Sequence, residues 1–136
     1  MGLSEIWPFH PEKCLAVRAD WACEQPEALI RLMRALIQAQ VICDLPAEAD
    51  SIAASLAVAD GLAQPRDAVR AALAGWASER IWFHGVGAGL PARPHALWFL
   101  RQMPRWGWLE ERIDLNDVAG TVYRPDLFSR AVCSEG

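Results

Sequence analysis

The chain has little of what marks a nucleic-acid-binding or membrane protein. Its 136 residues are enough for one domain, or for a piece of one. Lys13 is the only lysine, and a formal net charge of −4 argues against a basic surface for nucleic acid. No apolar run reaches the roughly 18 residues of a membrane span. We therefore expect neither a nucleic-acid partner nor a membrane-spanning segment.

The cysteines also lack the spacing of a metal or redox motif. None of the four forms a C-x-x-C pair: they are Cys14, Cys23, Cys43 and Cys133. Buried free thiols are the favoured interpretation, against a disulfide pair or a metal site, and they favour a reducing compartment. The stretch that begins at Met1 has no basic segment followed by a long apolar run, so we expect no signal peptide. As given, the chain is expected to be cytoplasmic.

One long helix is predicted over Pro26–Asp44, with the rest of the chain arranged around it. Proline suits the first helical position, where a backbone N–H would be unpaired anyway. At helical spacing the polar side chains fall on one narrow strip: Glu27, Arg31, Arg34 and Gln38. The wide apolar remainder predicts neighbours on most sides, with Leu36 in the core and Arg34 facing solvent.

The remaining sequence predicts further helices and one short strand. Cys14–Val17 (CLAV) has the composition of a strand, but four residues need partner strands that the chain does not supply. A helical turn or two is expected over Asp20–Gln25. Longer elements follow: Ala47–Ala59 ended by Gly61, Pro65–Ala74 ended by Gly75, His95–Met103 ended by Pro104 and Gly107, a short helix capped by Asp114 or Asn116, and a last helix from Pro125 to about Val132. The predicted fold class is mainly α.

No pattern predicts a catalytic or metal site. The glycine-rich stretch Gly85–Leu90 lacks the Gly-Lys-Ser/Thr ending of a phosphate-binding loop and is interpreted as a plain flexible loop. His84 and His95 have no third ligand at a suitable spacing for a metal. His10 beside Cys14 has no orienting group for a thiol–imidazole pair. We therefore expect no enzyme, no metal and no cofactor.

Tryptophan is unusually frequent for a chain of this length, with seven in the sequence. Three of them alternate with arginines: Trp98, Arg101, Arg105, Trp106 and Trp108. Such a mixture occurs on platforms for single-stranded nucleic acid. The acidic charge balance favours packed tryptophans with arginines at their edges. The excess predicts either an aromatic core or rings that meet surface outside this chain.

Three blocks of sequence, in this order, resemble one known family. They are HPEKCLAVRADWACEQPEALIRLMRALIQAQVICD (10–44), PHALWFLRQMPRWGWL (94–109) and VYRPDLFSRAV (122–132). They resemble the part that follows the ligand-binding region in nitrate- and bicarbonate-binding proteins of ABC transporters. The same family includes cytoplasmic nitrate/nitrite sensors that regulate an RNA-binding antiterminator.

The resemblance implies a part of a larger protein. Family members have two α/β lobes that close over the ligand, and this chain resembles their C-terminal third. Residues 1–136 are therefore expected to be a single helical unit, the helical C-terminal portion of a two-lobe periplasmic-binding-protein-like fold with one short strand near its N-terminus. The missing part would supply strand partners for Cys14–Val17 and surface for Trp7 and Trp106.

The implied function is non-catalytic binding of a small oxyanion, namely nitrate, nitrite or bicarbonate, in the complete protein. Family members carry a charged residue near the ligand just after the tryptophan that corresponds to Trp7. Here Pro8 takes that place, so Trp7, His10 and Lys13 are the ligand-binding candidates. A sensor subunit or helical interaction module is the alternative function.

Partners and location follow from the same resemblance. A protein partner would be a transporter permease or the antiterminator. A piece of a transport component would be periplasmic or membrane-associated. Alone, the chain is expected to self-associate through the exposed strand Cys14–Val17 and its neighbours Trp7 and Phe9.

Overall fold

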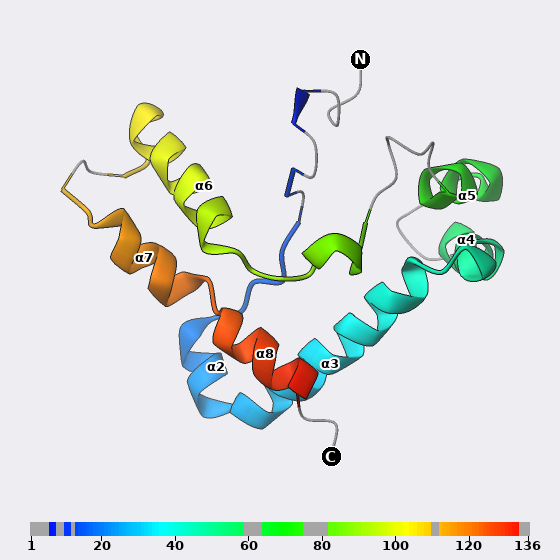
Figure 1. Ribbon diagram of the computed structural model, residues 1–136, viewed down its shortest axis with the longest axis horizontal. Helices are drawn as coiled ribbons and strands as arrows, with labels where there is room; N and C mark the ends of the chain where they lie inside the picture. Colours follow the sequence, from blue (N-terminus) through cyan, green and yellow to red (C-terminus); the bar gives the residue numbers. More distant parts are fainter. Residues whose placement is uncertain are drawn as a thin grey trace. The chain divides into compact units, whose positions relative to one another are not determined.

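The computed structural model describes residues 6–7, 10–11, 13–58, 64–74, 82–109 and 112–133, and the regular elements within these ranges are helices (Figure 1). The predicted mainly-α class is therefore confirmed. The chain divides into two compact units, one of residues 1–15 and 35–89 and the other of residues 16–34 and 90–136. That residues 1–136 act as a single helical unit of a longer protein stays a prediction.

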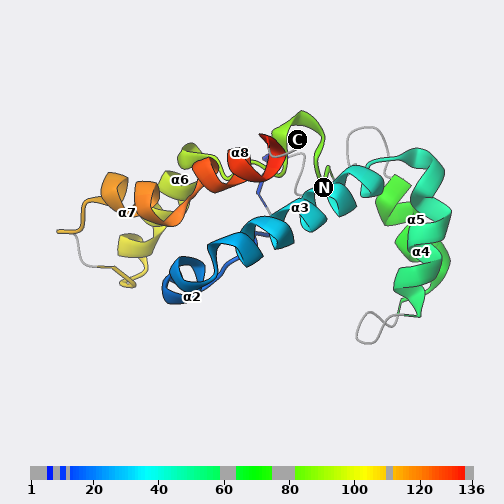
Figure 2. The same ribbon diagram turned by 90° about the horizontal axis from the view of Figure 1, so that it is seen from below.

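The unit of residues 16–34 and 90–136 is built from α2 (Ala19–Glu24), the first half of α3 (Pro26–Cys43), and three later helices. These are α6 (Arg93–Arg105), α7 (Leu115–Val122) and α8 (Pro125–Cys133). α6 packs against α7, and the pair stays side by side in a second view (Figure 1 and Figure 2). Glu27 at the start of α3 pairs with Arg130 of α8 at 3.6 Å.

Helix ends in this unit follow signals in the sequence. The Asp114 carboxylate accepts the N–H groups of Asn116 (2.8 Å) and Asp117 (3.3 Å), so it is the N-cap of α7. Gly107 has φ of 72°, and the N–H of the next residue donates to the Met103 carbonyl at 2.9 Å. This is the Schellman ending that favours glycine. Pro104, predicted to end α6, instead lies within its last turn.

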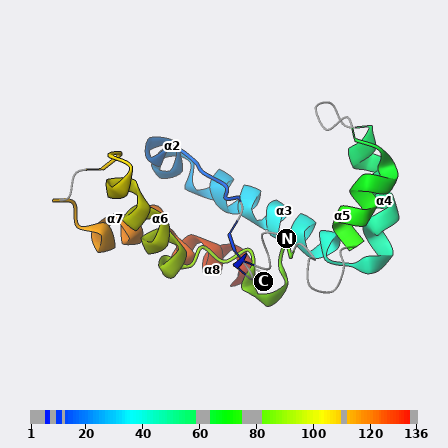
Figure 3. The same ribbon diagram turned by 90° about the horizontal axis from the view of Figure 1, so that it is seen from above.

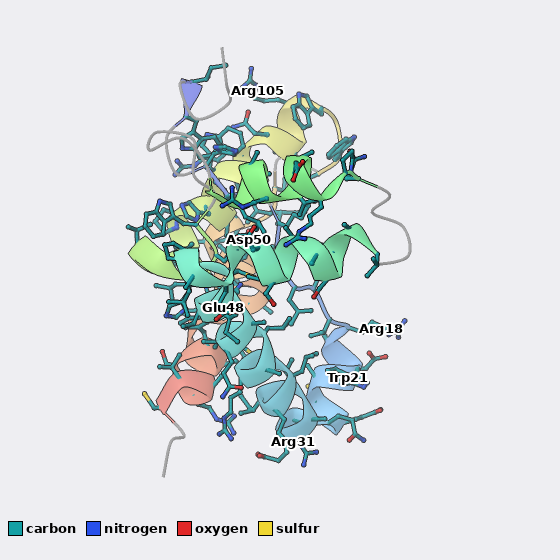
Figure 4. The ribbon with its side chains drawn as sticks, turned by 90° about the vertical axis from the view of Figure 1, so that its right-hand side faces the viewer. Arg18, Trp21, Arg31, Glu48, Asp50 and Arg105 are labelled. Carbon is teal, nitrogen blue, oxygen red and sulfur yellow. The ribbon has the colours of Figure 1, made fainter. Side chains whose placement is uncertain are left out.

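The other unit contains the second half of α3, the short 3₁₀ helix η1 (Pro46–Glu48), α4 (Ala49–Ala57) and α5 (Arg66–Ala74). α4 and α5 lie side by side in both Figure 1 and Figure 3. Asp50 lies on the face of α4 toward α5, where its carboxylate accepts a hydrogen bond from Arg70 at 2.5 Å (Figure 4). The predicted helix ends Gly61 and Gly75 lie outside the described residues.

The predicted long helix is confirmed as α3, but its predicted burial is wrong. Only Leu29 and Ile30 are buried on α3, whereas Leu36 is 38% exposed. Arg34, expected in solvent, is half-buried with its Nε atom covered. Helical periodicity identifies an apolar arc but does not say how much of that arc finds a neighbour. The fully buried residues of α3 lie in its first turns, and the later turns are at most half-buried.

Two further expectations need correction. The predicted strand Cys14–Val17 is not confirmed, because residues 13–18 form no regular element and a strand exists only in a ladder with a partner. The cysteines are free, as predicted, but they are exposed rather than buried, except for the half-buried Cys43. Its burial, and to a lesser degree the charge of Asp44, raises the pKa of the Cys43 thiol.

Candidate functional site

The most convergent polar arrangement in the described residues forms around Asp44, the residue after α3. Its Oδ1 accepts the backbone N–H of Phe83 at 3.0 Å, and its Oδ2 accepts those of His84 at 2.8 Å and Gly85 at 2.6 Å. The three donors are consecutive and lie 39 to 41 residues further along the chain. We call the Asp44 carboxylate with the N–H groups of residues 83–85 the Asp44 clasp. It pins the segment before α6 to the end of α3.

Close packing and unusual backbone angles shape the clasp. A Cβ atom on Gly85 would lie 2.4 Å from the Trp82 ring carbon Cε3, so no larger residue fits without movement. The following 3₁₀ turn η2 (Gly85–Gly87) contains Val86 at φ 53° and Gly87 at φ 77°. A positive φ costs a side-chain-bearing residue about 1–2 kcal/mol. The clasp therefore holds a turn that Val86 would not adopt by preference.

Two covered nitrogen atoms lack a hydrogen-bond partner among the described residues. They are Nε of Arg34 and Nδ1 of His84. The backbone N–H of His84 is the middle donor of the Asp44 clasp. The ring Nδ1 of the same residue is covered but makes no hydrogen bond to the described residues. Buried polar atoms in this state cost about 1–3 kcal/mol and require an explanation.

The ligand-binding candidates from the sequence lie near the N-terminus. The Nδ1 atom of His10 is 3.0 Å from the Trp7 carbonyl oxygen, and the two ring centroids are 6.4 Å apart. Lys13 is exposed, and Pro8 lies outside the described residues. These candidates belong to the same compact unit as the Asp44 clasp. Nothing in the structure tests their ligand-binding role, which stays a prediction.

The aromatic and arginine mixture around α6 is not packed as expected. Trp106 is 61% and Trp108 67% exposed, and their rings meet edge to face with centroids 5.1 Å apart. Trp98 and Phe99 form a second exposed edge-to-face pair at 5.0 Å. Arg105, in the last turn of α6, donates to the Gln102 side chain at 2.8 Å (Figure 4). The expectation of packed tryptophans is therefore wrong for this surface, which we call the α6 aromatic surface (Trp98, Phe99, Trp106 and Trp108).

A shallow hollow beside α2 is lined partly by charged side chains. It is lined by Val17, Arg18, Asp20, Trp21 and Glu24, of which Arg18 and Trp21 are labelled in Figure 4. The Arg18 guanidinium donates from Nε to the Asp20 carboxylate at 3.0 Å. This hydrogen bond raises the pKa of Arg18 and lowers the pKa of Asp20. Because the guanidinium is already paired with a carboxylate, the hollow is a poor site for an anion.

Comparison with known proteins identifies relatives along nearly the whole chain. The NMT1-like family model matches residues 3–58. The nitrate/nitrite binding protein NrtA of Synechococcus elongatus is 32% identical over an alignment that covers 97% of this chain and 32% of that protein. The bicarbonate-binding protein CmpA of the same organism is 30% identical, over 93% of this chain and 32% of that protein. The chain belongs to the nitrate/bicarbonate-binding protein family.

The chain is also similar to part of a transport protein that is named for ATP binding. The bicarbonate transport ATP-binding protein CmpC of Synechococcus elongatus is 32% identical over 93% of this chain, which covers 20% of that protein. The chain thus spans about a third of the length of its binding-protein relatives and a fifth of CmpC. No solved structure matches it.

The described part of this family member contains neither a metal cluster nor a membrane-spanning helix. No three His, Cys, Asp or Glu side chains gather there as metal ligands. No helix among the described residues is long and apolar enough to cross a bilayer. Sequence reasoning missed the Asp44 clasp, although an acidic residue just after a long helix and a glycine cluster were both visible. Nothing in the sequence indicated that the two would meet.

Proposed function

We propose that this chain is the helical C-terminal part of a solute-binding protein for nitrate, nitrite or bicarbonate in an ABC-type transport system, without catalytic activity. The observation that carries the proposal is the similarity to NrtA and CmpA along more than nine-tenths of the chain. The exposed α6 aromatic surface supports it, because uncovered apolar side chains of this kind often mark a surface that contacts another part of a protein or a partner.

In this proposal the chain supplies at most one wall of the anion site. Trp7, His10 and Lys13 would contribute that wall, with Lys13 providing positive charge and His10 a ring nitrogen. A small anion needs several converging donors to offset the loss of its water, so the other donors would come from the rest of the protein. The oxyanion is thus a partner of the complete protein, and the transporter permease is the protein partner. Such a transport component would be periplasmic or membrane-associated.

A chimera tests this proposal. The matching third of NrtA is replaced by this chain, and nitrate binding is measured by calorimetry. We expect the chimera to bind nitrate, and Lys13→Ala to weaken that binding by about 10- to 100-fold, as expected for loss of one charge-assisted hydrogen bond. Arg18→Ala, whose guanidinium is paired with Asp20, is the matched control and should leave binding unchanged. A folded chimera that binds no nitrate, with a CmpA chimera that binds no bicarbonate, would contradict the proposal.

The isolated chain provides the complementary measurement. We expect it to bind nitrate, nitrite and bicarbonate weakly or not at all, because it carries too few donors. A saturable heat of binding in calorimetry at micromolar anion concentrations would show that the site is complete within this chain, contrary to the proposal.

One observation favours a second function. A similar segment, 32% identical to this chain, occurs in CmpC, which is named as a bicarbonate transport ATP-binding protein rather than as a bicarbonate-binding protein. A segment used in both contexts suits a regulatory interaction module, such as a cytoplasmic nitrate/nitrite sensor that acts on an antiterminator. Affinity capture with the purified antiterminator, compared with the permease, distinguishes the two, since a transport component should retain only the permease.

A further inference from the structure

Three consecutive backbone N–H groups in this protein form a receptor that already holds an oxyanion. The donors Phe83, His84 and Gly85 converge on one carboxylate with N···O distances of 3.0, 2.8 and 2.6 Å. Successive N–H groups that face one concave side of the backbone make a nest, a common geometry for anion binding. The occupant, the Asp44 carboxylate, is planar and singly charged. Formate, nitrate and bicarbonate share both properties.

The shape of this nest is set partly by residues other than Asp44. Trp82 lies so close to Gly85 that an added Cβ would meet its ring at 2.4 Å. Positive φ angles at Val86 and Gly87 turn the chain directly after the third donor. The nest therefore has a framework of its own, which does not depend on the Asp44 side chain.

The occupant can be removed without disturbing the helix that carries it. The backbone N–H of Asp44 donates to the carbonyl oxygens of Gln40 and Val41, both at 3.2 Å, and so closes the last turn of α3. These bonds involve no side-chain atom of Asp44. We therefore expect a variant that lacks only the carboxylate to keep these backbone bonds of the helix end and to leave the three N–H groups without the Asp44 acceptor.

We propose that the Asp44 clasp is an oxyanion-binding site whose resident occupant is Asp44, and that a small planar oxyanion takes the same three N–H groups when that carboxylate is absent or outcompeted. The tethered carboxylate has a high effective concentration, so a free anion displaces it only when abundant. Displacement frees the segment 82–87 from the end of α3. This inference stands on the amide geometry alone and does not depend on the ligand of the parent protein.

The test compares wild type with Asp44→Ala by following the backbone amide resonances of residues 83–85. Each chain is titrated with formate, nitrate and bicarbonate, with chloride added to keep the ionic strength constant. In Asp44→Ala we expect saturable shifts of these three amides with all three anions. In wild type the same shifts should require anion concentrations at least about tenfold higher. Asp50→Ala removes a different, exposed carboxylate and should behave as wild type.

The outcomes separate the two halves of the proposal. If Asp44→Ala keeps its helical circular dichroism yet shows no saturable shift, the nest is not an oxyanion receptor. If Asp44→Ala binds while wild-type amides stay unmoved at the highest concentrations, displacement of the resident carboxylate is wrong. A separate titration with chloride alone that gives equal shifts, or shifts spread over the whole chain, would mean an adventitious ion only and would overturn the site.

Asp44→Asn provides a second variant should Asp44→Ala fail to fold. Its amide keeps one acceptor oxygen but loses the charge, so anion binding should fall between that of wild type and Asp44→Ala. If neither variant folds, the wild-type titration decides alone, since displacement requires its amides 83–85 to move. None of these results bears on the NrtA chimera, so the site and the transport function fail independently.

Discussion

Each of the two helix pairs, α4–α5 and α6–α7, has a buried alanine on its first helix. Ala53 of α4 is 0% exposed, and Ala96 of α6 is 1% exposed. A fully buried alanine leaves little room for a larger side chain. On their outer surfaces the pairs differ: α4–α5 carries the ion pairs of Asp50 with Arg66 and Arg70, whereas α6 and the residues directly after it carry the exposed rings of the α6 aromatic surface.

The two outer surfaces differ in how favourably water solvates them. The charged side chains between α4 and α5 pair with one another while they remain exposed to water, so covering them would add little stability. The exposed rings of the α6 aromatic surface leave apolar area uncovered, and such area in folded proteins often marks an interface. The two pairs therefore predict opposite responses to mutation of their outer side chains and similar responses to mutation of their inner ones.

The largest effect is expected at the inner alanines. Ala53→Leu and Ala96→Leu should each lower the free energy of unfolding by about 1–3 kcal/mol, because the added atoms do not fit at a fully buried position without displacing their neighbours. Urea denaturation measures both. Ala72→Leu, on the exposed side of α5, is the control and should stay within about 0.5 kcal/mol of wild type. If only one inner substitution is costly, the two pairs do not pack alike.

Next in size is the effect of the α6 aromatic surface on self-association. Trp106→Ser combined with Trp108→Ser should weaken association about tenfold, since two exposed rings are removed from the sticky surface. Sedimentation equilibrium measures the dissociation constant. Val58→Ser removes an exposed apolar side chain directly after α4, outside the α6 aromatic surface, and should change the dissociation constant little. If Leu15→Lys raises the dissociation constant more, self-association occurs through the N-terminal segment that the sequence predicted.

A smaller effect is expected from the charges between α4 and α5. A double-mutant cycle of Asp50→Asn and Arg70→Ala should give a coupling of about 0.2–1 kcal/mol, the usual range for exposed ion pairs. Added salt should reduce this coupling through screening. In the other pair, Arg93 donates to the neutral oxygens of Asn116 at 3.3 and 3.4 Å, so Arg93→Ala should show little salt dependence. If the coupling free energy between Asp50 and Arg70 does not fall as salt is added, the two helix pairs do not differ in their electrostatics.

The smallest effect concerns pH in the unit that carries α6 and α7. Arg124 donates to Asp126 at 2.8 and 2.6 Å, and these bonds lower the pKa of the Asp126 carboxyl. A lowered folded-state pKa contributes stability above the ordinary carboxyl value near 4, and this is lost as pH falls through the lowered value. Asp126→Asn should therefore be slightly less stable than wild type at pH 7, by a few tenths of a kcal/mol for so exposed a pair. The two should converge in acid, as thermal melts would show.

Local signals made most helices of the fold predictable. Pro26 begins α3, Asp114 caps α7 and Pro125 begins α8, because each of these effects acts within one helical turn. Burial was less predictable, as the exposed Leu36 and the half-buried Arg34 show. Which part of an apolar arc is covered depends on residues far away in the sequence or outside this chain.

The candidate site was less predictable than the fold. The sequence predicted a plain flexible loop at Gly85, because a glycine cluster does not indicate which residues it contacts. The partner is Asp44, about 40 residues earlier, and the bonds use backbone N–H groups that every residue except proline possesses. Trp7, His10 and Lys13 came from the family resemblance, and their role awaits the chimera.

The separation of 39 to 41 residues across the Asp44 clasp also bears on the order of folding events. Helices form from contacts three or four residues apart and complete within about a microsecond. The clasp must bring together the ends of a long loop, so it closes after the helices that flank it. It is equally a natural place for the native state to open first. Hydrogen exchange at residues 83–85 would then report a local opening that leaves the helices intact.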